Sequence, residues 1–229
     1  MTAALGWGAL AASSLVIGAL LGLARPWPGK LVGMVLAFGA GALISAVSFD
    51  LAQEGAQVGD PGFLALGLGA GALTYFTLDR LLERRGGGGT ALALGAFLDG
   101  IPEQAVLGIG IAAGEGVGVG LLVAIFVSNL PEAIGSATEM RAAGTRVSAI
   151  RRLWLAVAAI CTVATVAGYG IADSVSGNLN AAVDGFAAGA LLVMLIDSMI
   201  PEAVRKGGDV SGLVTALGFA VAAGLSGIS

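Results

Sequence analysis

Eight long apolar runs decide what this chain can fold into. They cover about residues 5–24, 31–54, 61–82, 90–113, 116–139, 151–172, 181–203 and 210–229. Each run is close to the roughly 20 apolar residues that an α-helix needs to cross a bilayer. Charged residues make up 11% of the chain, against about a quarter in a soluble domain, and are too few to cover a water-facing surface. We therefore predict an all-α, polytopic membrane protein, in which residues 1–229 form a single transmembrane domain of eight helices.

The basic residues predict how these helices are oriented. All eleven lie at the first, third, fifth and seventh connections between the runs: Arg25, Lys30, Arg80, Arg84, Arg85, Arg141, Arg146, Arg151, Arg152, Arg205 and Lys206. The other connections carry acidic residues such as Asp60, Glu115 and Asp173. Cytoplasmic loops of membrane proteins collect Lys and Arg. We therefore predict a multi-pass protein of the cell membrane with both termini outside the cytoplasm.

The composition also excludes several kinds of chemistry. The chain has no histidine, so it contains no Ser-His-Asp triad, no HExxH zinc motif and no His-ligated haem. Its one cysteine, Cys161, cannot form an internal disulfide. The net charge of −4 gives no reason to expect nucleic-acid binding. No connection is long enough for a nucleotide-binding domain, and we expect neither an enzyme nor an organic cofactor.

Two segments of the chain resemble one another. Residues 38–49 match residues 186–197, and Gln53-Glu54 continues in the same register as Pro201-Glu202. The copies lie in the second and seventh runs, so they cross the membrane in opposite directions. Inverted repeats of this kind are common in secondary transporters. We predict that runs 1–3 and 6–8 are inverted repeats around a central fourth and fifth helix; shared Gly/Ala-rich composition is the alternative explanation.

The polar chemistry is concentrated in the fourth and fifth runs. The fourth contains Asp-Gly-Ile-Pro-Glu at 99–103, and the fifth contains Ser-Asn-Leu-Pro-Glu at 128–132. In each motif the first and last residues are four apart and share a helix face. Each proline frees one backbone carbonyl of the preceding turn. The candidate site residues are Asp99, Glu103, Ser128, Asn129 and Glu132.

These acids need a partner. No Lys or Arg of the sequence lies deep enough in a run to pair with them, and an unpaired ionised carboxylate is costly in a low-dielectric site. The acids must therefore hold protons or a cation, and a site that alternates between the two couples cation binding to protonation. The alternative is that protonated acids bond to nearby backbone and only pack the helices, although intramembrane acids are functional by default.

These motifs resemble those of the ZIP (Zrt/Irt-like) family of divalent-metal transporters, and most closely its short prokaryotic members. The resemblance rests on eight runs, Gly-Ile-Pro-Glu in the fourth, Ser-Asn-Leu-Pro-Glu in the fifth and Ile-Pro-Glu-Ala in the seventh. It covers nearly the whole chain. It implies a secondary transporter that moves a divalent cation (Zn, Mn, Fe or Cd) as its substrate through a midplane site on the fourth and fifth helices, as one helix group rocks against the other.

The chain lacks the histidines of the family pattern. The family's fourth-helix motif is typically His-Asn-x-Pro-Glu-Gly. Here Asp99, Gly100 and Gln104 stand where the His, the Asn and the final Gly would be, and Glu103 is retained. The resemblance therefore implies a carboxylate in place of an imidazole.

The fifth and sixth helices depart from the family as well. Ser128 stands where His or Gln is usual, Asn129 where Asp, Asn or Glu is usual, and Glu132 is retained. Family members often add a glutamate from the sixth helix that bridges a second metal. That run has no carboxylate here; its polar candidates are Cys161, Thr162 and Thr165. Because carboxylate, amide and hydroxyl oxygens suit hard ions such as Mn²⁺ or Mg²⁺, we predict one oxygen-rich site of broad divalent selectivity.

Two other functions stay open at this point. The chain could carry a non-metal or proton-coupled substrate on the same frame, or it could be a membrane sensor that transports nothing. The expected partners are the metal ion and the lipid bilayer, with no nucleic acid, and a homodimer is left open.

Overall fold

The computed structural model describes residues 1–84, 89–113, 119–172 and 177–226, and these residues are almost entirely helical, without a strand. The elements are α1 (Thr2–Ala24), α2 (Gly29–Ala46), η1 (Val47–Gln53), α3 (Glu54–Val58), α4 (Pro61–Arg84), α5 (Gly89–Ala113), α6 (Val119–Ala142), α7 (Val147–Ala172), α8 (Gly177–Met194), η2 (Leu195–Met199), α9 (Ile200–Gly207) and α10 (Ser211–Ser226). α2, η1 and α3 form one continuous helix, and so do α8, η2 and α9. A chain with so few charges satisfies its backbone polar groups within helices, as lipid requires.

Six helices of the described residues are long and apolar enough to cross a membrane: Thr2–Ala24, Gly29–Val58, Pro61–Leu81, Leu121–Ala142, Val147–Ala172 and Gly177–Gly207. This confirms the prediction of an all-α, polytopic membrane protein. The predicted count of eight spans also included α5 and α10. α10 has 16 residues and is about 24 Å long at 1.5 Å per residue, shorter than a ~30 Å hydrocarbon core. For the first part of α5, no side chains are among those described.

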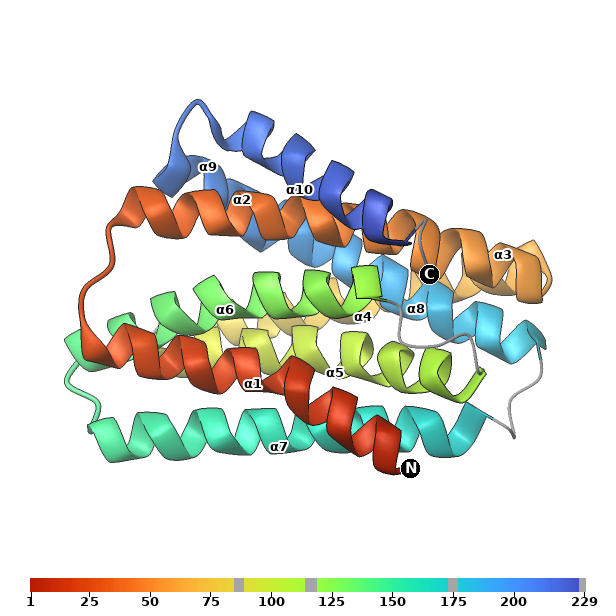
Figure 1. Cartoon of the computed structure of the whole chain (residues 1–229), viewed down its shortest axis with the longest axis horizontal. Helices are drawn as coiled ribbons and strands as arrows, with labels where there is room; N and C mark the ends of the chain where they lie inside the picture. The colour runs from red at the N-terminus through yellow and green to blue at the C-terminus, as the bar shows by residue number, and fades with distance from the viewer. Residues whose placement is uncertain (85–88, 114–118, 173–176, 227–229) are drawn as a thin grey trace.

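The helices pack in two groups. In one group, α1 packs on α6 and α7, and α5 packs on α7. In the other, α4 packs on α8, and α10 packs on α2. Figure 1 shows α1, α5 and α7 on one side of the view and α2, α9 and α10 on the other. α6 also packs against α2 and α10, so it lies at the boundary between the groups.

Glycines bring α4 and α8 into close contact. A Cβ atom on Gly71 of α4 would overlap the carbonyl oxygen of Phe186 in α8, and one on Gly189 of α8 would overlap the carbonyl oxygen of Leu68 in α4. Small residues at such crossings let two backbones approach in a membrane. The glycine-rich composition therefore serves tight helix packing.

Each of the two longest helices contains a π-helical segment. η1 interrupts the helix that begins with α2, and η2 interrupts the helix that begins with α8. Asp50 lies in η1 and Asp197 in η2. Short π-helical segments are frequent at functional sites, and both segments begin inside the matching stretches 38–49 and 186–197.

Candidate metal site

The two proline-bearing helices lie next to each other, as predicted. α5 contains Pro102 and α6 contains Pro131, and both helices continue through their proline. α5 and α6 are in contact. Because a proline leaves one carbonyl without its usual helical partner, each helix has a polar backbone group beside its glutamate.

Three of the five candidate residues are fully buried. Glu103, Ser128 and Asn129 each expose 1% of their surface, and Glu132 is partly buried. Both carboxylate oxygens of Glu103 are inaccessible to solvent. Burying a carboxylate so deeply is costly unless a proton, a donor or a cation compensates it. Among the described candidates, Glu103 is therefore the residue that most needs a proton, a hydrogen-bond donor or a cation to compensate its burial.

Ser128 and Asn129 add polar atoms beside the glutamate of α6. The Ser128 hydroxyl donates a hydrogen bond to the Ile125 carbonyl at 3.1 Å, and a hydroxyl that donates one bond can still offer its oxygen lone pairs to a donor or a cation. The buried Asn129 Nδ2 has no hydrogen-bond partner among the described residues. Leaving a buried donor unpaired costs about 1–3 kcal/mol. That cost fits a site that admits water or a hydrated ion.

The fifth candidate cannot be placed. The side chain of Asp99 in α5 lies outside the described residues. Within the described part of the chain, no three or more His, Cys, Asp or Glu side chains gather as a metal-holding group. The described candidates supply two carboxylates, one amide and one hydroxyl, so the assembly of all five residues into one site stays a prediction.

The site faces the other helix group. A Cβ atom on Gly39 of α2 would lie 3.0 Å from Ser128 Cα and 3.0 Å from Met199 Cε. Gly39 therefore lets α2 approach the α6 backbone at the level of Ser128, and Met199 of η2 lies beside them. Any movement between the two groups would change the surroundings of Ser128.

Two contacts between α5 and α7 were not predicted. The Thr165 hydroxyl donates a hydrogen bond to Oε1 of Gln104, and Gln104 is fully buried. A Cβ atom on Gly100 would lie 2.7 Å from the Cys161 sulfur. Besides Asp99, Gly100 and Gln104 are the positions at which this motif differs from the ZIP-type motif that it resembles. The sequence contained a signal for these contacts. Gly100 and Gln104 are four residues apart, and so are Cys161 and Thr165, so each pair lies on one helix face.

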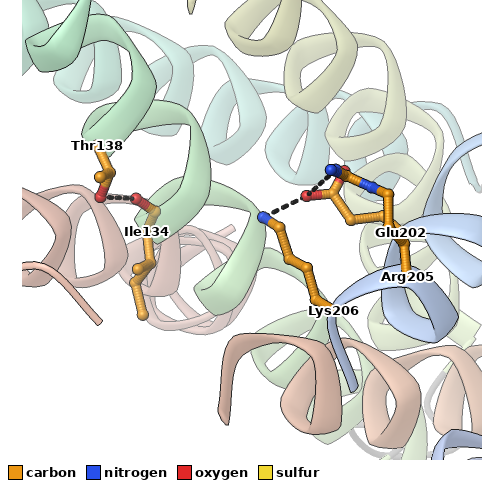
Figure 2. A network of polar contacts seen from close by, with 5 residues as sticks. All are labelled: Ile134, Thr138, Glu202, Arg205 and Lys206. Atoms are coloured by element: carbon orange, nitrogen blue, oxygen red, sulfur yellow. Dashed lines mark hydrogen bonds and ion pairs between the residues drawn. The ribbon is translucent and has the colours of Figure 1, made fainter. Parts of the chain in front are cut away.

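A lysine also reaches α6. Figure 2 shows Lys206 extending from α9 toward the α6 helix, with Glu202 paired to both Lys206 and Arg205. Lys206 Nζ lies 3.7 Å from the position that a Cβ atom on Gly135 would occupy. The sequence placed no basic residue near the candidate acids, but this ammonium group lies one helical turn beyond Glu132.

Comparison with known proteins found one informative relative. The chain is 32% identical over 196 residues to a protein of Arabidopsis thaliana named "Putative zinc transporter". The match covers 79% of this chain and 30% of that protein, so the chain spans less than a third of its relative's length. No family model matches the chain.

Proposed function

We propose that this chain is a ZIP-like secondary transporter, not an enzyme, and that it moves a divalent metal cation across the cell membrane. The observation that carries the proposal is the carboxylate of Glu103, 1% exposed inside an apolar helix bundle and next to the proline-bearing helix α6. A buried acid in a membrane helix typically marks an ion or proton path. The likeness to a plant protein named as a zinc transporter supports a metal as the cargo.

The proposed site takes ligands from α5 and α6. Asp99 and Glu103 would come from α5, and Ser128, Asn129 and Glu132 from α6. All the donor atoms are oxygens, which suit Mn²⁺ and Mg²⁺ and also accept Zn²⁺, Fe²⁺ or Cd²⁺. Gly100 has no side chain to offer as a ligand, and the amide oxygen of Gln104 already accepts the hydrogen bond from Thr165. α7 has Cys161 and Thr165 but no carboxylate. We therefore propose one ion per chain and broad divalent selectivity.

The proposed topology has eight spans, with α5 as the fourth and α10 as the eighth; because the described part of α10 is shorter than the hydrocarbon core, it would span only where the bilayer thins around it. The connections at 25–28 and 143–146 lie at one end of the bundle, and the N-terminus and the last described turn of α10 lie toward the opposite end (Figure 1). The basic residues Arg25, Arg141 and Arg146 lie at or beside these connections. Because basic loops stay in the cytoplasm, the termini would be extracytoplasmic.

We also propose the inverted repeat, in the register of the sequence match. In that register Gly41 corresponds to Gly189, and the first residue of η1 corresponds to the first residue of η2. A Cβ atom on Gly41 would overlap the carbonyl of Thr215 and lie 2.7 Å from the amide nitrogen four residues later. A Cβ atom on Gly189 would overlap the carbonyl of Leu68 and lie 2.9 Å from the amide nitrogen four residues later. Gly108 and Gly185 meet the same pair of atoms on their partner helices, so this geometry is general to close glycine crossings and the proposed repeat rests on the sequence match.

The mechanism follows from the two helix groups. The candidate site lies on α5 and α6, which belong to the group with α1 and α7, and it faces α2 and η2 across the boundary at Gly39. Sliding or rocking at that boundary would open Ser128 and the glutamates first to one side of the membrane and then to the other. The glutamates would bind the ion where access is open and would take up protons after it leaves.

The test is ion uptake by the purified chain in liposomes, with Zn²⁺, Mn²⁺, Fe²⁺, Cd²⁺ and Mg²⁺ offered in turn. Glu103→Gln and Glu132→Gln keep the shape of the side chain and remove its charge. Losing a charged ligand costs about 1.5–3 kcal/mol, or roughly tenfold or more in uptake. Asp209→Asn is the control, because Asp209 is exposed in the turn before α10. Uptake of no ion at all, or uptake that neither glutamate substitution lowers, would reject the proposal in favour of a sensor or an organic carrier.

A further inference from the structure

One face of α6 leads from the candidate site toward the basic end of the bundle. Ser128, Glu132 and Gly135 follow one another at spacings of four and three residues, so they share that face. Gly135 lies on the side of Glu132 that is nearer to Arg141 and the end of α6 at Ala142. An ion that leaves Glu132 along this face toward the basic end must pass Gly135.

The ammonium group of Lys206 lies at this point. Among the described residues, its Nζ is the one atom from another helix that lies within 4 Å of a Cβ position built on Gly135, at 3.7 Å. The Lys206 side chain is 21% exposed, whereas that of the neighbouring Arg205 is 70% exposed. Lys206 therefore turns toward α6, and the missing side chain of Gly135 leaves room for it.

Two contacts hold Lys206 in this position. Glu202, one turn earlier in α9, forms an ion pair with its ammonium group. At its backbone, a Cβ atom on Gly33 of α2 would lie 2.6 Å from the carbonyl carbon of Lys206. The start of the side chain is fixed against α2, and only its flexible four-carbon stem can move. The pair is only partly exposed, and even exposed Glu-Lys pairs add at most about 1 kcal/mol to stability, so the ion pair explains how the lysine is held but not why it faces another helix.

We propose that Lys206 is a gating residue, whose ammonium group closes the ion path along α6 at Gly135 and is held there by Glu202. This inference rests on the proposed function. When the site is empty, the tethered cation blocks the basic end of the path and supplies positive charge close to Glu132. When a divalent ion moves past Glu132, like-charge repulsion displaces the ammonium group, and the path opens toward the side that carries the basic loops.

Ion uptake tests the gate directly. The variants are Lys206→Gln, which removes the charge at nearly the same length, and Lys206→Arg, which keeps it. Arg205→Gln is the matched control, because it removes an equal charge from the neighbouring, exposed position. Removing a repulsive charge within one helical turn of the path should raise the initial uptake rate of Lys206→Gln about tenfold, with Lys206→Arg and Arg205→Gln within about twofold of the unsubstituted chain. A rate for Lys206→Gln that is unchanged or lower would overturn the proposal.

A second measurement does not depend on uptake. Gly135→Cys adds a thiol to the face of α6 beside Lys206, and the unsubstituted chain is the blank because Cys161 is buried. A quaternary-ammonium methanethiosulfonate reagent should label this thiol about tenfold faster when Lys206→Gln is added, and no faster when Arg205→Gln is added. Equal labelling rates for Gly135→Cys alone, with Lys206→Gln and with Arg205→Gln would overturn the proposed gate even if uptake is normal. An unsubstituted chain that takes up no ion would instead reject the proposed function, while the labelling still reports whether Lys206 shields Gly135.

Discussion

Two glycines of α4 give the sharpest test of the packing. Gly71 and Gly69 are two residues apart on the same helix. A Cβ atom on Gly71 would overlap the carbonyl oxygen of Phe186 and lie 2.7 Å from its carbonyl carbon. A Cβ atom on Gly69 would meet nothing within 4 Å. The same substitution, glycine to alanine, should therefore have opposite effects at the two positions.

The expected difference follows from the atoms that the new methyl group meets. At Gly71 the neighbour is backbone, which cannot rotate away, and overpacking of this kind costs about 1–3 kcal/mol. At Gly69 there is no clash, and replacing a helical glycine by alanine gains about 0.5–1 kcal/mol. The two variants should differ by about 2 kcal/mol or more in free energy of unfolding, which is roughly 4–8 °C in melting temperature for a chain of this size.

The assay is thermal unfolding in detergent, followed by the fraction of protein that stays monodisperse after heating. Gly71→Ala should melt below the unsubstituted chain, and Gly69→Ala should melt at the same temperature or slightly above it. Equal melting temperatures for the two variants would refute the close α4–α8 packing. A lower melting temperature for Gly69→Ala than for Gly71→Ala would do so as well.

Two further substitutions test contacts that join helices. Thr165→Val removes the hydrogen bond to Gln104 while keeping the shape of the side chain. It should lower the free energy of unfolding by about 0.6–1.7 kcal/mol, the range for such bonds between membrane helices. An unchanged melting temperature would contradict this expectation. Arg141→Gln removes the guanidinium that donates a hydrogen bond to the Leu23 carbonyl of α1, and should cost about 1.5–3 kcal/mol. Arg152→Gln is its control, because Arg152 is exposed and its hydrogen bond among the described residues goes to Ser148 of its own helix. Equal losses for the two arginine variants would mean that the α1 contact contributes nothing.

Hydropathy predicted the long helices well but not their ends. The second run was predicted to end at residue 54 and the seventh at residue 203, whereas the helices extend to Val58 and Gly207. Both extensions contain polar or charged residues, such as Gln57 and Lys206, which end an apolar run without ending a helix. The π-helical segments inside these helices were not predicted either, because an apolar run has no sequence signal for one extra residue in a turn.

The site was predictable only where a residue's own helix decides its surroundings. The burial of Glu103 and Ser128 follows from their place in the middle of apolar runs, and the structure agrees. The placement of Lys206 depends on how α9 packs on α2 and on a glycine in α6, contacts between segments far apart in the sequence. Near the end of its own helix, a lysine is expected to point to water. Long, flexible side chains of this kind are placed by tertiary packing and not by local pattern.

The central claim is that α5 and α6 build one oxygen-rich site for one divalent ion. Equilibrium dialysis of the purified chain against Mn²⁺ or Zn²⁺, with Glu103→Gln, Glu132→Gln and the double variant, tests it most directly. We expect one ion per chain for the unsubstituted protein and about tenfold weaker binding or worse for each single variant. Because both carboxylates would hold the same ion, the double variant should lose less affinity than the two single losses combined. No bound ion, two bound ions per chain, or full affinity in Glu103→Gln would contradict the account.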